Sequence, residues 1–291
     1  MLCGCIDIGS NTTRLLVAEA TDGRLDELLA QRAFTRIGKG LKPGAEIPRA
    51  KIEEVADVVA AHSGLAAEIG AHPVRTVATA AIRGAANRDE FVRVVSERGG
   101  VEVTILDGEE EARLAFLGAT RTLPQSLDGT VGVVDVGGGS TEIAVGTVGG
   151  GVTWWASFRL GSGHLADEYL RSDPPTAAEL EATRAHAKSV LDGLDVPLPR
   201  SAVAVGGSAA SLRRLVGPVL EPIATGRALN LLATAPAAEI ARRLSLDQQR
   251  IRLLPAGMLI LEAASERLGC PLVIGRGGLR EGVLLELAGG R

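Results

Sequence analysis

Aromatic side chains are scarce in this chain. They make up 2% of its 291 residues, so Leu, Val, Ile and Ala must supply the core. A platform on which single-stranded nucleic acid stacks needs exposed rings, so this shortage argues against that class of binding protein. The formal net charge of -4 gives no general attraction for polyanions. Any anion site must therefore be local, and we expect no nucleic-acid partner.

Cysteines and long apolar runs are also few. Cys3, Cys5 and Cys270 lack the paired spacing of a structural zinc site. Because Cys3 and Cys5 would share one face of a buried strand, we interpret them as core thiols. No run is long enough to cross a membrane, and the start lacks the basic and apolar regions of a signal peptide. We therefore expect a cytoplasmic protein with no membrane partner.

The length favours two domains, each able to bury its own core. Hydrophobic residues at 46% and charged residues at 23% are ordinary for a globular protein. The segment TLPQSLDG, with Pro124 and Gly129, interrupts the pattern of strands and helices and is the candidate junction. The predicted domains are residues 1–124 and 125–291.

Strands and helices alternate along the first half of the chain. We predict strands over 5–8, 13–20, 28–37, 73–79 and 101–106, and helices over 52–69, 87–100 and 108–121. The second half restarts with three strands separated by glycines. There we predict strands over 130–136, 140–148, 152–160, 202–205 and 271–275, a loop over 206–211, and helices over 164–170, 177–194, 236–268 and 278–288.

One pattern occurs twice. CIDIGSNTTRLLVAEA contains Asp7, and VVDVGGGSTEIAVGTV contains Asp135, 128 residues further along. In both copies a Gly follows two positions after the Asp, and a Ser lies just beyond. Gly lets main-chain N–H groups approach a ligand, and hydroxyls add donors, so each loop could bind an anion. An ordinary Gly-rich hairpin turn is the alternative for either copy alone.

The two carboxylates complicate an anion site because an Asp repels a phosphate. A divalent cation between them would reverse that repulsion. Mg²⁺ typically binds through one or two carboxylates, several waters and the substrate's own phosphate oxygens. Two such hairpins facing each other across a domain cleft would therefore form a magnesium and phosphate site.

The order of motifs resembles a known fold. DIGSN, DVGGGST and AVGGSAAS resemble the phosphate and adenosine motifs of actin, Hsp70 and the sugar kinases. The resemblance implies an α/β fold with two duplicated actin-like (ribonuclease H-like) domains and an interdomain phosphate-binding cleft. Within that superfamily, ATAAIRGAANRDEF, ILDGEEEARLAFLGA, PAGMLIL and GGLREGVLL resemble the Ppx/GppA phosphatases in their short, two-domain form. Those enzymes are exopolyphosphatases and guanosine pentaphosphate phosphohydrolases.

The resemblance implies roles for particular residues. Glu111 would align or activate the attacking water, and Arg83 would hold the terminal phosphate. From the sequence alone, Glu109, Glu110 and Glu111 could simply be acids favoured by the dipole of a helix start. The implied metal ligands, for Mg²⁺ or another divalent cation, are Asp7, Asp135 and Glu142. The implied phosphate-binding residues are Gly9, Ser10, Asn11, Gly137, Gly138, Gly139, Ser140, Thr141, Gly206, Gly207 and Ser208.

The leading hypothesis is a Mg²⁺-dependent exopolyphosphatase that acts as a homodimer, with a monovalent-cation requirement left open. Hydrolysis of pppGpp is the alternative, and the sequence does not decide between these two substrates. A small-molecule kinase or ATPase of the same fold would bind nucleotide at GGSAAS, but the GEEEAR element argues against it. A polyphosphate or alarmone sensor without turnover would lack Glu111 or Asp135, and both are present.

Overall fold

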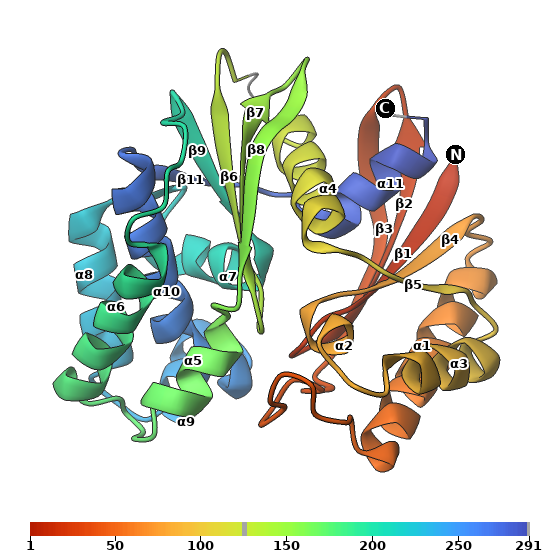
Figure 1. Ribbon diagram of the computed structural model, residues 1–291, viewed down its shortest axis with the longest axis horizontal. Helices are drawn as coiled ribbons and strands as arrows, with labels where there is room; N and C mark the ends of the chain where they lie inside the picture. Colours follow the sequence, from red (N-terminus) through yellow and green to blue (C-terminus); the bar gives the residue numbers. More distant parts are fainter. Residues whose placement is uncertain (124–126, 290–291) are drawn as a thin grey trace. The chain divides into compact units, whose positions relative to one another are not determined.

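The computed structural model describes residues 1–123 and 127–289, and the chain divides into two compact units (Figure 1). The first unit comprises Met1–Thr122 and Gly277–Arg291, and the second comprises Leu123–Arg276. Each unit is a sheet with helices packed on it. No helix within the described ranges is long and apolar enough to cross a membrane.

The first unit contains a five-stranded sheet in the order β3-β2-β1-β4-β5. The strands β1, β2 and β3 form an antiparallel meander, and β4 and β5 run parallel to β1. The strands are β1 (Leu2–Ile8), β2 (Thr13–Thr21), β3 (Arg24–Ala33), β4 (Val74–Ala78) and β5 (Val103–Ile105). The helices of this unit are α1 (Arg49–Glu68), α2 (Ala80–Arg83), α3 (Arg88–Gly99), α4 (Gly108–Arg121) and α11 (Leu279–Leu287).

Helices cover both faces of this sheet, as the alternation of side chains along a strand requires (Figure 1). Ile6 and Ile8 on β1 belong to the core shared with α1 and α3. Cys3 and Cys5 point the other way and belong to the core shared with α4 and α11. Both thiols are fully buried, which confirms that they lie on one face of a buried strand.

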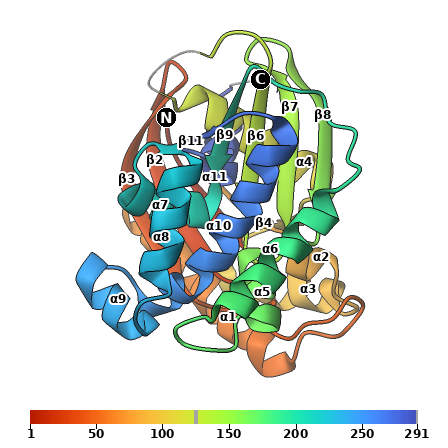
Figure 2. The ribbon, with the colours of Figure 1, turned by 90° about the vertical axis from the view of Figure 1, so that its left-hand side faces the viewer.

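The second unit contains a six-stranded sheet in the order β10-β11-β9-β6-β7-β8. Its strands are β6 (Val131–Val136), β7 (Thr141–Thr147), β8 (Gly151–Phe158), β9 (Ser201–Val205), β10 (Val219–Leu220) and β11 (Leu272–Ile274). Its helices are α5 (Ser162–Tyr169), α6 (Ala177–Leu191), α7 (Gly206–Val216), α8 (Pro222–Leu232), α9 (Ala237–Leu244) and α10 (Gln248–Leu268). The long helix α10 is mostly buried and lies between α8 and α6 in Figure 2.

The two sheets repeat one topology. Strands β6, β7 and β8 form a meander like that of β1, β2 and β3, and β9 and β11 add in parallel as β4 and β5 do. The registers also match, because Asp7 pairs with Val77 on β4 and Asp135 pairs with Val205 on β9. The predicted α/β fold built from a duplicated domain is therefore confirmed.

Most predicted elements are present, and the differences are of detail. The predicted strand over 28–37 is displaced, because β3 spans Arg24–Ala33, and the short helix α2 was not predicted. The segment GGSAAS is not a loop, because α7 begins at Gly206 and the alanines that follow favour a helix. The predicted helix over 236–268 is two helices, α9 and α10. They are separated at Ser245, whose φ of 50° is left-handed and ends α9. The short strand β10 and the helix α8 were not predicted.

The last helix packs in the first unit, although its sequence position predicted the second domain. Two glycines allow this close packing of α11 on α4. A Cβ on Gly118 would lie 1.9 Å from the carbonyl oxygen of Gly278, and one on Gly282 would lie 1.9 Å from that of Leu114. The predicted boundary after Pro124 falls among residues 124–126, which lie outside the described residues, and it stays a prediction.

Candidate active site

The first Asp loop is a tight turn between β1 and β2. The N–H of Gly9 donates to the carbonyl oxygen of Thr12 at 3.0 Å. A Cβ on Gly9 would lie 3.2 Å from that same oxygen, so a side chain there would crowd the turn. Ser10 is mostly buried and Asn11 is partly exposed. The predicted phosphate residues of this loop therefore share one compact backbone turn.

Asp7 lies at the start of this loop and is buried. Its Oδ1 has no hydrogen-bond partner among the described residues. Burial raises the pKa of Asp7, and the nearby positive charges of Arg14 and Arg280 oppose that rise. A buried carboxylate oxygen without a donor is costly unless it has a ligand to bind. Asp7 therefore fits the role of a cation ligand.

Arg14 stands directly across the hairpin from Asp7, in the β1–β2 register. Its Nε donates to Thr12 Oγ1 at 3.0 Å, which ties the guanidinium to the loop. Arg14 was not predicted as a site residue from the sequence. Extending the alignment of the two hairpins to the position opposite each Asp would have found it, because Glu142 occupies that position in the second copy.

A second set of charged residues in the first unit joins α2 to α4. The Nη1 of Arg83 donates to Glu111 Oε2 at 2.9 Å and to the carbonyl oxygen of Leu106 at 2.7 Å. Glu111 is 6% exposed, whereas Glu109 is exposed. Glu110 instead pairs with Arg113 at 2.8 Å, and this bond lowers its pKa. Burial and the bond to Arg83 therefore distinguish Glu111 from its neighbours, which the sequence alone could not do.

A main-chain segment supports the first loop by hydrogen bonds to its carbonyl groups. Residues 34–48, which connect β3 to α1 and which we call the strap, run beside this loop (Figure 1). The N–H of Gly38 donates to the carbonyl of Ser10, and the N–H of Arg36 donates to that of Asn11. In a trans peptide the C=O and the following N–H point in opposite directions. The N–H groups of Asn11 and Thr12 therefore point away from the strap.

The second Asp loop repeats the first. The N–H of Gly137 donates to the carbonyl oxygen of Ser140 at 2.9 Å, as Gly9 does to Thr12. Opposite Asp135, however, stands Glu142, which is 2% exposed. Its Oε1 accepts a hydrogen bond from Ser157 Oγ on β8 at 2.8 Å. Two acids thus lie side by side at the end of β6 and β7.

The N-terminus of α5 supports this second loop. Ser162 donates through its N–H to the carbonyl of Gly137, and the N–H groups of Gly163 and His164 donate to that of Gly138. A Cβ on Gly161 would lie 2.3 Å from the oxygen of Gly138, so only Gly fits there. Because these carbonyls face α5, the N–H groups of Gly138 and Gly139 point away from it. Like the strap, α5 leaves the donors of its loop free for an anion.

Thr141, the first residue of β7, is buried, and its hydroxyl donates to the carbonyl of Leu160. The other predicted residues lie at the start of α7. Gly206 has a φ of 89°, and a Cβ there would lie 2.4 Å from Asp135 Oδ1. Gly206 and Gly207 are partly exposed, as residues in contact with a ligand would be. Ser208 is different, because its hydroxyl is buried without a hydrogen-bond partner and lies against Gly257 of α10. The predicted phosphate contact of the Ser208 side chain is therefore not supported by its position.

The carboxylates fit a divalent cation of the Mg²⁺ type. Within residues 1–123 and 127–289, no three His, Cys, Asp or Glu side chains converge in a ready-made metal site. Asp135 and Glu142 form a neighbouring pair instead. One or two carboxylates are what Mg²⁺ usually takes from a protein, since waters and substrate phosphates complete its shell.

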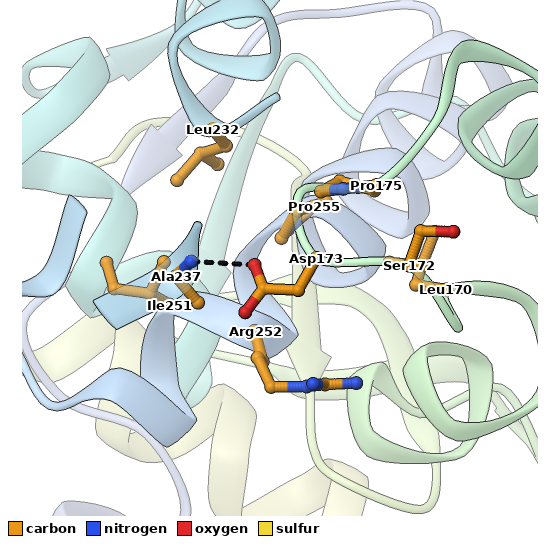
Figure 3. A pocket seen from close by; sticks show the side chains of 9 residues that line it. All are labelled: Leu170, Ser172, Asp173, Pro175, Leu232, Ala237, Ile251, Arg252 and Pro255. Atoms are coloured by element: carbon orange, nitrogen blue, oxygen red, sulfur yellow. Dashed lines mark hydrogen bonds between the residues drawn. The ribbon is translucent and has the colours of Figure 1, made fainter. Parts of the chain in front are cut away.

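A pocket in the second unit is lined by none of the predicted site residues (Figure 3). Asp173 and Arg252 are its charged members, and the other lining residues are mainly apolar. Asp173 Oδ1 accepts a hydrogen bond from the N–H of Ala237, the first residue of α9, at 2.7 Å. The carboxylate therefore caps a helix, and the pocket is a structural junction.

Known proteins match this chain over almost its whole length. The Ppx/GppA phosphatase family matches residues 16–290. The chain belongs to this family. An uncharacterized protein of Streptomyces coelicolor is 33% identical, over 98% of this chain and 90% of that protein. Exopolyphosphatase 1 of Mycobacterium leprae is 30% identical, over 98% of this chain and 89% of its own length.

Two further family members are informative. The guanosine-5'-triphosphate,3'-diphosphate pyrophosphatase of Aeromonas salmonicida is 28% identical, and the chain spans 60% of that relative's length. A crystal structure of the Aquifex aeolicus member of the family has a TM-score of 0.81 with 29% identity, covering 99% of this chain and 97% of the other. The fold and the family are thus shown, and the chain is a phosphatase of the Ppx/GppA type.

Proposed function

We propose that the protein is an exopolyphosphatase that hydrolyses the terminal phosphoanhydride of inorganic polyphosphate and releases orthophosphate. The observation that carries this proposal is the ion pair of buried Glu111 with partly exposed Arg83. A carboxylate that is 6% exposed and held by one guanidinium nitrogen is a positioned base rather than a surface acid. The mycobacterial relative named exopolyphosphatase supports the choice of substrate.

The residues of the first unit divide the work between binding and proton transfer. Within residues 1–123 and 127–289, the hydrogen bonds of Arg83 to the protein come from Nη1, so Nε and Nη2 are left for oxygens of the terminal phosphoryl group. Guanidinium suits this task because it is planar and keeps its charge. Glu111 aligns a water for in-line attack and accepts its proton as the new P–O bond forms. The bridging P–O bond breaks, and the shortened chain leaves as an oxyanion.

In the second unit the N–H groups of Gly138 and Gly139 bind phosphate oxygens, and the start of α7 at Gly206 adds donors. Asp135 and Glu142 would hold Mg²⁺, and the same role stays a prediction for Asp7. When bound, Mg²⁺ would neutralise phosphate charge in the transition state. Hydrolysis of pppGpp is the second candidate, and the Aeromonas relative is the observation that favours it. A homodimer also stays a prediction.

Glu111→Gln tests the proposal. Orthophosphate release would be measured from polyphosphate, pppGpp and ATP, with Mg²⁺ and with EDTA. We expect release from polyphosphate to need Mg²⁺ and to fall about 10²- to 10⁴-fold in the variant, the usual loss when a general base is removed. Glu109→Gln is the matched control, because this exposed neighbour on the same helix turn should keep full activity.

Three outcomes would contradict parts of the proposal. If wild type consumes ATP and leaves polyphosphate untouched, the kinase or ATPase alternative is favoured. Faster release from pppGpp than from polyphosphate would favour the second candidate. Full activity of Glu111→Gln would show that the residue is not the base.

A further inference from the structure

The strap between β3 and α1 carries three cations within seven positions, namely Arg36, Lys39 and Lys42. Lys39 and Lys42 are exposed and Arg36 is partly exposed. Its only acid is Glu46, and no ion pair within the described residues engages any of the three cations. Like charges so close together repel one another, since the screening length is about 8 Å at physiological salt. No ion pair among residues 1–123 and 127–289 offsets this clustering.

The cations of the neighbouring helices contrast with those of the strap. Arg49 pairs with Glu53, Arg93 with Glu97, and Arg98 with Asp57. Those residues lie on solvated helix faces, where a nearby acid balances the charge of each arginine. The strap cations therefore differ from these paired cations of α1 and α3.

The strap is fixed in place at both ends. At its start it donates N–H groups to the carbonyls of Ser10 and Asn11. Arg36 adopts a left-handed φ of 46°, which costs a non-Gly residue about 1 kcal/mol or more and persists only where neighbours enforce it. Here the hydrogen bond from its N–H to Asn11 does so. The cations thus lie on an anchored segment and not on a loose loop.

The other end is bound to the residues that follow Arg83. The N–H of Gly44 donates to Gly84, and the N–H of Ala86 donates to Ala45. Asn87 donates to the carbonyl of Ile47 and accepts from its N–H, at 3.0 and 2.8 Å. The three cations therefore lie between an anchor on the first phosphate loop and an anchor on the turn that carries Arg83.

We propose that the strap is a second anion site, which binds phosphate groups of the substrate other than the one that is hydrolysed. This inference rests on the proposed function. The N–H groups of the first loop point away from the strap, so an anion bound by those donors lies on the side of the loop opposite the strap. The strap cations are therefore left for other parts of the substrate. They bind phosphates further along the same molecule. These are either inner phosphates of a polyphosphate chain or the 3'-diphosphate of a guanosine nucleotide.

The test compares two triple variants in a Glu111→Gln background, which slows turnover during binding. The first is Arg36→Ala with Lys39→Ala and Lys42→Ala. The matched control is Arg88→Ala with Arg93→Ala and Arg98→Ala, which removes the same charge from α3 in the same unit. The ligands are inorganic triphosphate, size-fractionated medium-chain polyphosphate, GTP and pppGpp, measured by calorimetry at several salt concentrations.

We expect the strap triple to bind triphosphate and GTP within about twofold of its parent. Its affinity for the ligand with distal phosphates should fall about tenfold, the sum of three exposed charge contacts. The slope of log affinity against log salt should drop by about 2, since each contact on a flexible polyanion contributes about 0.7. If affinity falls for polyphosphate alone, the strap binds inner phosphates of the chain. If affinity falls for pppGpp alone, the strap binds the 3'-diphosphate. Arg36→Lys with Lys39→Arg and Lys42→Arg should retain binding.

Equal losses for short and long ligands, or the same loss in the α3 control, would overturn the strap site and leave the proposed function intact. An unchanged affinity for every ligand would do the same. If the enzyme with Glu111 intact releases no orthophosphate from polyphosphate or pppGpp, and its Glu111→Gln form binds neither, both the proposed function and the strap site fail together.

Discussion

In the first unit the residue across the hairpin from Asp7 is Arg14, whereas in the second the residue across from Asp135 is Glu142. The backbones of the two hairpins are alike, down to the Gly N–H that closes each turn. Duplication thus kept the loop and changed its charge. The first hairpin pairs its acid with a base, which lowers the net charge of the hairpin, and the second sets two acids together, as suits a cation.

Of the tests of this contrast, Glu142→Gln should have the largest effect, which is on activity at low Mg²⁺. Glutamine keeps an oxygen that can accept from Ser157 Oγ, so the fold should survive the loss of charge. We expect activity at low Mg²⁺ to fall about 10- to 100-fold, the usual cost of disturbing the residues around a metal. Partial recovery at high Mg²⁺ should follow.

Ser157→Ala is the control for Glu142→Gln, because it removes the hydrogen bond and keeps the charge. It should change the Mg²⁺ requirement much less. A Glu142→Gln variant with the wild-type Mg²⁺ requirement would show that the second acid has no part in cation binding.

Asp7→Asn tests the first hairpin through stability. Burial raises the pKa of Asp7, so the folded protein holds this proton more tightly than the unfolded chain does. The contribution of this proton to the free energy of unfolding is complete below the pKa of Asp7 in the unfolded chain. It is lost as pH rises through the pKa of Asp7 in the folded protein. At neutral pH the variant should therefore be the more stable protein, on the order of 1 kcal/mol in the free energy of unfolding.

Chemical denaturation of both proteins at several pH values would measure this difference. It should shrink as pH falls towards the ordinary carboxyl range near about 4. A less stable Asp7→Asn at neutral pH would mean that Arg14 and Arg280 outweigh the cost of burial.

The sequence was sufficient to predict the structural features that arise from repeated patterns of residues. The matching Asp-x-Gly patterns predicted the duplicated sheets, and hydrophobic periodicity predicted most strands and helices. It could not predict that α11 packs on α4, because this depends on close contacts of Gly118 and Gly282 with backbone atoms far away in the chain. It also could not separate Glu111 from Glu109 and Glu110, since only tertiary packing decides which of three adjacent acids is buried.

The segments that support the two Asp loops also could not be predicted from the sequence. Ser162 to His164 lie where the sequence predicted the junction of a strand and a helix, yet nothing in the sequence showed that their N–H groups orient the carbonyls of the second loop. The strap orients the carbonyls of the first loop in the same way, although it is an irregular segment and not a helix. Backbone hydrogen bonds between distant segments leave little trace in side-chain patterns, so neither support could be predicted.

Thr12 offers the smallest test of the comparison between hairpins, because Ser140 occupies its position in the second loop. Thr12→Ser makes the two loops alike there and keeps the oxygen that accepts from Arg14 Nε, so stability and activity should hardly change. Thr12→Val has nearly the same shape but leaves Arg14 without this acceptor. We expect it to lose about 0.5–1.5 kcal/mol in urea unfolding, the usual net value of one hydrogen bond. Equal stability of the Ser and Val variants would show that the bond from Arg14 to Thr12 contributes nothing, and that the charge opposite Asp7 is held by other contacts.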